Sequence, residues 1–393
     1  MTSATGPLAG IRIVDMTSVL MGPFATQILA DYGADVIKIE SAEGDLIRLA
    51  GAMRNAKMGS LFLQCNRNQR SVVLDAKTAQ GRAALLKLCE DADVFVSNIR
   101  PSALKRLGMD YADVKACSPG IVYVSLVGYG QAGPYKDRPA YDDLIQGISA
   151  IPSLIGRTQN SKPQYVPITL ADKVVGLAAA HAILAALVYK GRTGLGQSIE
   201  VPMFEVMSQF VLTDHLGGRC FEPAQGPAGY NRLLAPDRRP YETSDGFISL
   251  LVYTDEHWRK FFQLIGRPEE FDQSPMFHDH ATRTRSYDEA YRFLAGVVKT
   301  KTSHEWQLAL ERYDIPWAPT HSIEELIDDP HLESVNLFQT MDHPSEGKQR
   351  MIAPPITFSL TPSSIYRHPP NLGEHTAEVL EEFGIAAPAA EAA

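Results

Sequence analysis

Short apolar runs and helix-like segments alternate along the first half of the chain. The runs are rich in Val and Ile and end at polar residues, which is typical of buried β-strands. The segments between them carry helix signals, such as Pro23 for a first helical turn and Gly33 for a helix end. Strands that alternate with helices predict an α/β fold with a doubly wound parallel sheet. The predicted strands cover residues 11–15, 35–40, 71–75, 93–97 and 121–126, with a further strand at 198–201.

The loop after the first predicted strand is informative, because parallel sheets bind ligands beyond the carboxyl ends of their strands. It runs Thr17-Ser-Val-Leu-Met-Gly22 and lacks the GxGxxG pattern of a dinucleotide site. The GxxxxGK[ST] pattern of nucleoside triphosphate sites is also absent from the sequence. A dehydrogenase or a binding protein on a similar fold is therefore a weak alternative.

A long apolar segment begins directly after Asp172. From Val174 to Val188 the only polar residue is His181, which predicts a helix buried nearly all round and a hydrogen-bonded core histidine. Burial raises the pKa of a carboxyl group and a helix N-terminus lowers it, so the two effects on Asp172 oppose each other. In either case Asp172 is a carboxylate held away from bulk water. A purely structural role as a helix cap or first-turn residue is the alternative.

The second half of the chain predicts a smaller unit joined by linkers. Residues 217–240 are rich in Gly, Pro and Arg and predict a linker. A strand-like run at 246–253 and helical segments at 257–265, 286–299 and 304–313 follow. A Pro-rich tail at 352–370 leads to a helix at 374–383, and we expect the residues from 386 to 393 to be disordered.

Composition narrows the class of protein. The 393 residues suffice for two or three domains, and 45% hydrophobic with 21% charged residues is ordinary for a globular protein. The net charge of −9 without a basic cluster argues against nucleic acid as a partner. The apolar run is too short and interrupted to predict a membrane span, and the absence of a signal peptide favours a cytoplasmic protein. His278 and His280 lack further ligands, so we expect no metal site. The cysteines carry no CxxC pair and are expected to be reduced: Cys65, Cys89, Cys117 and Cys220.

Short motifs occur in a fixed order along nearly the whole chain. They cover residues 8–15 with Gly22 and Pro23, then 29–40, 66–75, 92–98, 128–134, 171–172, 191–197 and 371–375. Each motif alone is weak, but their order and spacing together are highly specific. In this respect the chain resembles the family III CoA-transferases, which include formyl-CoA transferase, carnitine CoA-transferases and α-methylacyl-CoA racemase.

The resemblance implies a catalytic role for Asp172. In the transferases, the carboxylate at this position attacks an acyl-CoA thioester and forms an aspartyl–acyl anhydride and a CoA thiolate. The thiolate then forms an aspartyl-CoA thioester, and the acceptor acid reverses the sequence. Such nucleophilic catalysis needs a site from which water is excluded, because anhydrides hydrolyse. The implied substrates are an acyl-CoA and a carboxylic acid, coenzyme A thioester is a substrate, and no permanently bound cofactor is expected.

The resemblance also implies the residues that bind coenzyme A. Val19 and Leu20 would line the site beside the aspartate, and Tyr141 and Asp142 would lie near the pantetheine and the reaction centre. Leu74, Asn98 and Ile99 would pack the adenine end, and Arg106 would meet the nucleotide phosphates. A structural role stays open for each of them, such as a core position for Leu74 or a solvated helix charge for Arg106.

Some positions depart from branches of this family. The formyl-CoA branch has Gln at the Leu20 position, Arg at Ser41 and Lys at Pro139, which argues against formyl–oxalate specificity here. The racemase branch uses His near the position of Tyr141. An ordinary Tyr titrates near pH ~10 and is a poor base at neutral pH, which favours the transferase over the alternative, an acyl-CoA racemase or epimerase. Candidates to bind a substrate carboxylate are Arg48, Arg70 and Arg100, although ordinary ion pairs are the alternative for each.

The resemblance finally implies an architecture of two interlocked, ring-like chains in a homodimer. The large, CoA-binding, Rossmann-like domain would comprise residues 1–215 and 325–393. The smaller α+β domain with its linkers would comprise residues 216–324. The linkers predicted near 217–240 and 315–330 fit this plan.

Overall fold

A computed structural model describes residues 5–386 of the chain. The predicted disorder of the last residues lies, from 387 onward, outside these described residues. Contacts divide the chain into two compact units. The larger unit contains the residues up to 149, 166–209 and those from 330 onward, and the smaller unit contains 150–165 and 210–329.

The larger unit is built on a six-stranded parallel sheet in the order β3-β2-β1-β4-β5-β6. The predicted α/β fold with a doubly wound parallel sheet is therefore confirmed, and each predicted strand lies within two residues of an observed one. The strand order reverses between β1 and β4, the place where sheets of this kind bind ligands. The strands are β1 (Arg12–Met16), β2 (Asp35–Glu40), β3 (Gln69–Val73), β4 (Val94–Ser97), β5 (Val122–Val127) and β6 (Ser198–Pro202).

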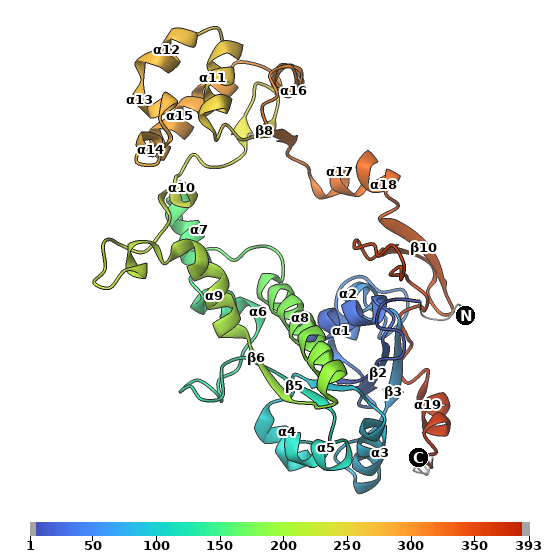
Figure 1. Ribbon diagram of the computed structural model, residues 1–393. Coiled ribbons are helices and arrows are strands. Elements are labelled where there is room, and N and C mark those ends of the chain that lie inside the picture. The colour runs from blue at the N-terminus through green and yellow to red at the C-terminus, as the bar shows by residue number, and fades with distance from the viewer. Residues whose placement is uncertain (1–4, 387–393) are drawn as a thin grey trace. The chain divides into compact units, whose positions relative to one another are not determined.

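Helices cover both faces of this sheet (Figure 1). On one face, α3, α4, α5 and α19 bury a continuous apolar core against the strands. On the other, α1 and α8 pack side by side, and the missing side chain of Gly176 permits this, because a Cβ there would lie 2.8 Å from the Met21 carbonyl oxygen. These helices are α1 (Met21–Asp31), α3 (Ala79–Glu90), α4 (Pro101–Leu107), α5 (Tyr111–Cys117), α8 (Leu170–Thr193) and α19 (Thr376–Glu382).

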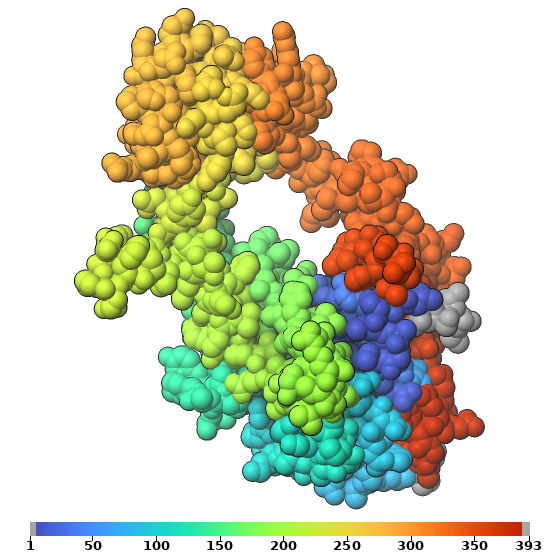
Figure 2. Space-filling view, viewed as in Figure 1, coloured from blue at the N-terminus to red at the C-terminus, as the bar shows by residue number. Residues whose placement is uncertain are grey.

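Helix α8 corrects one sequence prediction. It is not buried all round, because a stripe including Leu177, His181 and Val188 is exposed, and α8 lies at the surface, in green, in Figure 2. His181 is therefore not a core histidine. The prediction failed because small and apolar side chains fill both the packed and the exposed face, so the sequence carries no amphipathic signal. With 24 residues and a mean hydropathy of 1.7, α8 has the length and composition to cross a membrane, but its other face packs against α1 and the sheet.

Shorter elements complete the larger unit. The β10–β11 hairpin pairs antiparallel, and no strands were predicted from the sequence in this stretch before the Pro-rich tail. Helix α9 was also not predicted, and it continues from the larger unit into the smaller one. The bounds are η1 (Leu46–Leu49), α2 (Ser60–Cys65), α6 (Asp142–Ile148), α9 (Met203–His215), α18 (Pro330–Ser334), β10 (Phe338–His343) and β11 (Gly347–Ile352).

The smaller unit has a core of aromatic side chains, in which Trp258, Phe261, Phe262 and Trp306 are fully buried. A three-stranded antiparallel sheet with the order β7-β8-β9 packs with helices, as expected for an α+β unit. The strands are β7 (Tyr241–Glu242), β8 (Phe247–Leu250) and β9 (Trp317–Pro319). The helices are α7 (Ile151–Gln159), η2 (Gly217–Cys220), α10 (Asn231–Leu234), α11 (Asp255–Leu264), α12 (Pro268–Gln273), α13 (Pro275–His278), α14 (His280–Arg283), α15 (Tyr287–Val298), α16 (Ser303–Arg312) and α17 (Ile323–Ile327).

Candidate active site

Two loops meet where the strand order of the large sheet reverses. The first follows β1 and contains Ser18 and Val19, and the second follows β4 and begins with Asn98. The Asn98 side chain joins them, because its oxygen accepts the Ser18 N–H at 3.0 Å and its amide donates to the Ser18 carbonyl at 2.8 Å. These hydrogen bonds therefore hold together the two loops that a ligand at this end of the sheet would contact.

A cavity of about 310 Å³ opens beside these loops. It brings together most of the residues that the sequence singled out: Asp172, Val19, Leu20, Asn98, Ile99, Tyr141 and Asp142. They come from the loops after β1 and β4, from the start of α6 and from the first turn of α8. Residues that are distant in the sequence thus line the same cavity as Asp172.

Asp172 lies in the first turn of α8, and its backbone N–H donates to Asp142 Oδ1 at 3.0 Å. Burial, and after it the neighbouring carboxylates of Asp142 and Asp143, together raise the pKa of Asp172 to about 7, against a smaller lowering by Lys173. Within residues 5–386 the Asp172 carboxylate forms no ion pair. About half of it would be ionised at neutral pH, so it is able to act as a nucleophile without a bound cation to neutralise it.

The buried side chain of Gln146 holds the approach to α8 in place. Its amide donates to Asp142 Oδ2 at 2.5 Å and to the Ile168 carbonyl at 3.3 Å, and its oxygen accepts the Val166 N–H at 3.0 Å. Gln146 was not predicted from the sequence. Nothing in the local pattern distinguishes it from a surface glutamine, because Val166 and Ile168, two of its three partners, lie in a separate segment of the chain.

A second cavity of about 530 Å³ adjoins the first, since Ser18 and Ile99 line both. Leu74, which was expected at the adenine end of coenzyme A, lies in this second cavity. Arg106 is exposed on α4 and lines neither cavity. All residues expected to bind coenzyme A, except Arg106, therefore line one or the other of these two neighbouring cavities.

Basic residues line the first cavity, and the sequence pointed to only one of them. Arg100 was a candidate to bind a substrate carboxylate, whereas Lys136 and Arg138 were not singled out. The other candidates are engaged in ion pairs. Arg48 pairs with Glu40, and Arg70 pairs with Asp35 and Glu382. Within the described part of the chain, no cluster of three or more His, Cys, Asp or Glu side chains could hold a metal ion.

Known proteins with this sequence pattern transfer coenzyme A. The chain is 32% identical to a succinate–glutarate CoA-transferase of Agrobacterium fabrum, over 96% of each chain. It is 30% identical to the human succinyl-CoA:glutarate CoA-transferase, over 96% of this chain and 86% of the human one.

Solved structures agree with the sequence relatives. A CaiB/BaiF family protein from Brucella suis superposes with a TM-score of 0.80 at 28% identity, over 96% of this chain and 100% of that one. A protein from Mycobacterium tuberculosis superposes with a TM-score of 0.82 at 28% identity, over 96% and 99% of the two chains. Residues 8–376 match the sequence model of CoA-transferase family III. This match spans most of the chain and both units, so the protein is an enzyme of CoA-transferase family III.

Proposed function

We propose that this enzyme moves coenzyme A between carboxylic acids through covalent intermediates on Asp172. The observation that carries the proposal is the carboxylate of Asp172, which has no ion-pair partner within the described residues, a pKa of about 7 and a position in a cavity at the ligand-binding end of the sheet. A carboxylate fully neutralised by a cation would be a weaker nucleophile. A carboxylate that lies beside other carboxylates, as Asp172 does, is not neutralised in this way, so its oxygen can attack the thioester.

The chemical steps follow from the carboxylate. An Asp172 oxygen attacks the thioester carbonyl, the C–S bond breaks, and the CoA thiolate leaves an aspartyl–acyl anhydride behind. The thiolate attacks the Asp172 carbonyl of this anhydride, so that the donor acid leaves as a carboxylate and an aspartyl-CoA thioester remains. The acceptor carboxylate attacks that thioester, its C–S bond breaks, and the thiolate leaves an aspartyl–acceptor anhydride behind. The thiolate then attacks the acceptor acyl carbonyl of this anhydride, which gives the new acyl-CoA and frees the Asp172 carboxylate. Each step exchanges one bond for another and needs no redox partner.

The two adjoining cavities support a placement for coenzyme A in the large, Rossmann-like unit. We place the thioester beside Asp172, between Val19, Leu20, Tyr141 and Asp142, and the adenine end toward Leu74, Asn98 and Ile99. Arg106, exposed on α4, would reach the nucleotide phosphates from outside the cavities. We expect no permanently bound cofactor, because the chemistry is supplied by Asp172 and by the thioester itself.

We propose dicarboxylic acids as the substrate class. Relatives over nearly the full length are named for succinate, glutarate and mesaconate. Arg100, Lys136 and Arg138 line the same cavity as Asp172 and would attract the second carboxylate of such an acid.

The alternative, racemisation of an acyl-CoA, has less support. It needs a base that moves an α-proton, and Tyr141, 65% exposed at the cavity, stands where the racemases have histidine. An enzyme that exchanged the α-proton of a 2-methylacyl-CoA with deuterated water at a rate comparable to transfer would favour the racemase.

We further propose that the enzyme works in the cytoplasm as an interlocked homodimer, with the large domain at 1–215 and 325–393 and the small domain at 216–324. The exposed apolar side chains of α8, including Leu177, Val188 and Tyr189, support a partner surface. Light scattering after size exclusion, from nanomolar to micromolar concentration, should show a dimer throughout. A monomer, or subunit exchange within minutes, would contradict interlocking and leave the Asp172 chemistry standing.

Trapping of the covalent intermediate tests the mechanism. The enzyme is incubated with succinyl-CoA and no acceptor acid, and the reaction is quenched rapidly or treated with hydroxylamine. We expect the peptide that contains Asp172 to carry the adduct in a mass spectrum, and Asp172→Asn to carry none. Transfer from succinyl-CoA to glutarate without any detectable adduct would show direct exchange and contradict the covalent pathway.

A further inference from the structure

The loop between β1 and α1 contains a strained residue at the cavity wall. Val19 has a φ of 68°, in the left-handed region that β-branched residues rarely adopt. The loop is also closed tightly onto α1, because a Cβ at Gly22 would lie 2.2 Å from the Thr17 Cβ. Such a conformation persists only where the surroundings impose it.

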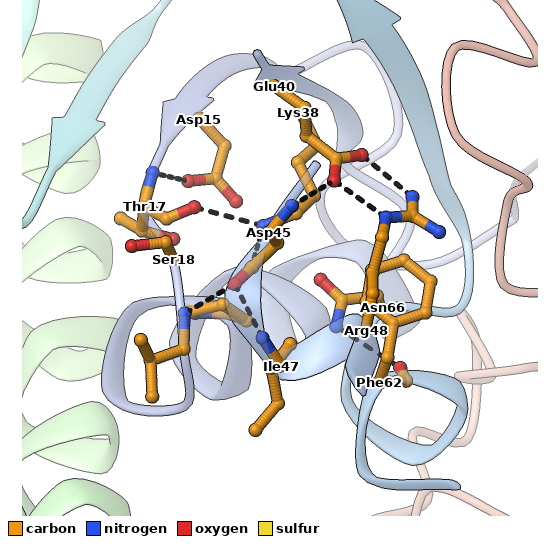
Figure 3. Close-up of polar contacts among 12 residues, drawn as sticks. Asp15, Thr17, Ser18, Lys38, Glu40, Asp45, Ile47, Arg48, Phe62 and Asn66 are labelled. Carbon is orange, nitrogen blue, oxygen red and sulfur yellow. Dashed lines mark hydrogen bonds and ion pairs between the residues drawn. The ribbon is translucent and has the colours of Figure 1, made fainter. Parts of the chain in front are cut away.

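Buried polar side chains impose this conformation group by group (Figure 3). The Thr17 N–H donates to Asp15 Oδ1 at 2.7 Å, and the Thr17 carbonyl accepts Lys38 Nζ at 2.9 Å. Asn98 holds both polar backbone groups of Ser18, as described above. The Val19 N–H donates to Asp45 Oδ1 at 2.9 Å. Hydrogen bonds from buried side chains therefore hold the backbone of three consecutive residues, the last of which is the strained Val19.

Asp45 and Lys38 form the centre of this arrangement. Lys38 Nζ lies 3.0 Å from Asp45 Oδ2, and both side chains are buried. The oxygen of Asp45 that holds Val19 also accepts the Ile47 N–H at 3.1 Å, as the cap of η1. Glu40 fixes Asp45 in turn by accepting its backbone N–H at 2.9 Å. The carboxylate is thus held from several sides and has little freedom to move.

We propose that Asp45 and Lys38 are positioning residues, which hold Val19 in its strained conformation and so shape the wall of the cavity that Val19 and Leu20 form and that Asp172 also lines. The inference rests on the proposed function for its catalytic consequence. They act through the loop and not on the thioester. A displaced wall would leave coenzyme A misplaced relative to Asp172, and small misplacements of reacting atoms cost large factors in rate.

A double-mutant cycle between Asp45 and Val19 tests this. Asp45→Asn keeps the shape of the side chain but removes its charge, so the Lys38 contact is lost. We expect kcat/KM to fall by about tenfold or more and the affinity for free coenzyme A, measured by calorimetry, to weaken. Glycine adopts a φ of 68° without strain, so the same change in the background of Val19→Gly should cost markedly less. A role limited to fold stability would give equal losses in both backgrounds, and this outcome would overturn the proposal.

Asp31→Asn is the matched control. Asp31 forms a buried pair with Arg67 at 2.6 Å in the same unit and lines neither cavity. It should lower stability but change kcat/KM by less than about threefold. Should Asp45→Asn not fold, Lys38→Met/Asp45→Asn removes both charges together and takes its place in the cycle. The affinity for coenzyme A is measured in every variant, so a wild-type enzyme that transfers nothing would contradict the proposed function while the cycle still tests the loop.

Discussion

Glu40 and Asp172 are both carboxylates at the same end of the sheet, and their surroundings give them opposite properties. Burial alone would raise the pKa of Glu40, but hydrogen bonds from Arg48 and the charge of Lys38 outweigh it and lower the pKa to about 2. Asp172 is partly buried beside other carboxylates, and its pKa rises to about 7. A buried carboxylate with cationic partners, such as Glu40, therefore stays ionised and stabilises the fold. A carboxylate without such partners, such as Asp172, has a raised pKa and is a candidate for chemistry.

The comparison also separates the two faces of the cavity. The wall formed by the loop after β1 is rigid, since buried ions hold its backbone. Other lining residues of the same cavity, Tyr141, Lys136 and Arg138, are exposed. Under the proposed placement of coenzyme A, the held wall would contact the part of the substrate that does not vary, and the exposed residues would contact acids of different size.

The largest effect is expected from Asp172→Asn, which removes the nucleophile and keeps the shape. Steady-state transfer from succinyl-CoA to glutarate should fall by at least about a thousandfold in kcat, while the affinity for coenzyme A stays near that of the wild type. Asp143→Asn makes the same chemical change at an exposed position of α6 and should retain most of the activity. An Asp172→Asn enzyme with more than about a tenth of wild-type turnover would rule out the covalent role.

The sequence pointed to Asp172 as the candidate nucleophile, and the structure places it in the cavity, whereas the ionic partners of Glu40 could not be predicted. Asp172 heads a long apolar segment, and the family motif covers it, so both local pattern and resemblance point to one residue. Lys38 and Glu40 alternate with buried apolar residues of β2, which signals that buried charges need partners. The sequence does not say which partners, because Asp45 and Arg48 reach them only through the fold.

The elements of the fold could likewise be predicted from the sequence only in part. Strand β2 was predicted to the residue and the other strands of the large sheet to within two residues, because their apolar runs are short and end at clear signals. The β10–β11 hairpin was missed, since strands like Gly347–Ile352 mix polar and apolar residues without a clear alternation. The exposed face of α8 was missed because apolar residues occupy it. Periodicity thus fails where a surface is apolar.

The second effect concerns the partnered carboxylate. Glu40→Gln should lower the free energy of unfolding by about 3–5 kcal/mol at neutral pH, because Arg48 is fully buried and would lose its counter-charge. The pKa of Glu40 is lowered, so its contribution is present above 4.5 and is lost as the pH falls through about 2. Urea unfolding at several pH values should therefore show the two proteins converging in acid. Glu90→Gln breaks the exposed pair with Lys87 and should have a much smaller effect at any pH.

The third effect has the opposite sign and belongs to Asp172. Its pKa is raised from 3.8 to about 7, so between these values the folded protein holds a proton that the unfolded chain has lost. Stability therefore declines as the pH rises through this window. Asp172→Asn removes that penalty and should raise the free energy of unfolding by on the order of 2 kcal/mol above neutrality, with no gain in acid. An equal or lower stability at alkaline pH would show that the carboxylate is solvated and the comparison with Glu40 is false.

The smallest effect is a displacement of the pH–rate profile. Because the nucleophile is the ionised form, kcat/KM should rise with pH and level off above the Asp172 pKa of about 7 in the free enzyme. Asp142 raises that pKa by its charge, after the larger contribution of burial. Asp142→Asn keeps an oxygen to accept the Asp172 N–H, so it should move the midpoint to lower pH by a fraction of a unit without removing the helix contact. Asp143→Asn should move it less in the same direction, since the charge of Asp143 contributes less. A midpoint unmoved by both changes would mean that the rise in rate reports a group other than Asp172. The lack of a cationic partner beside Asp172 would then not explain its reactivity.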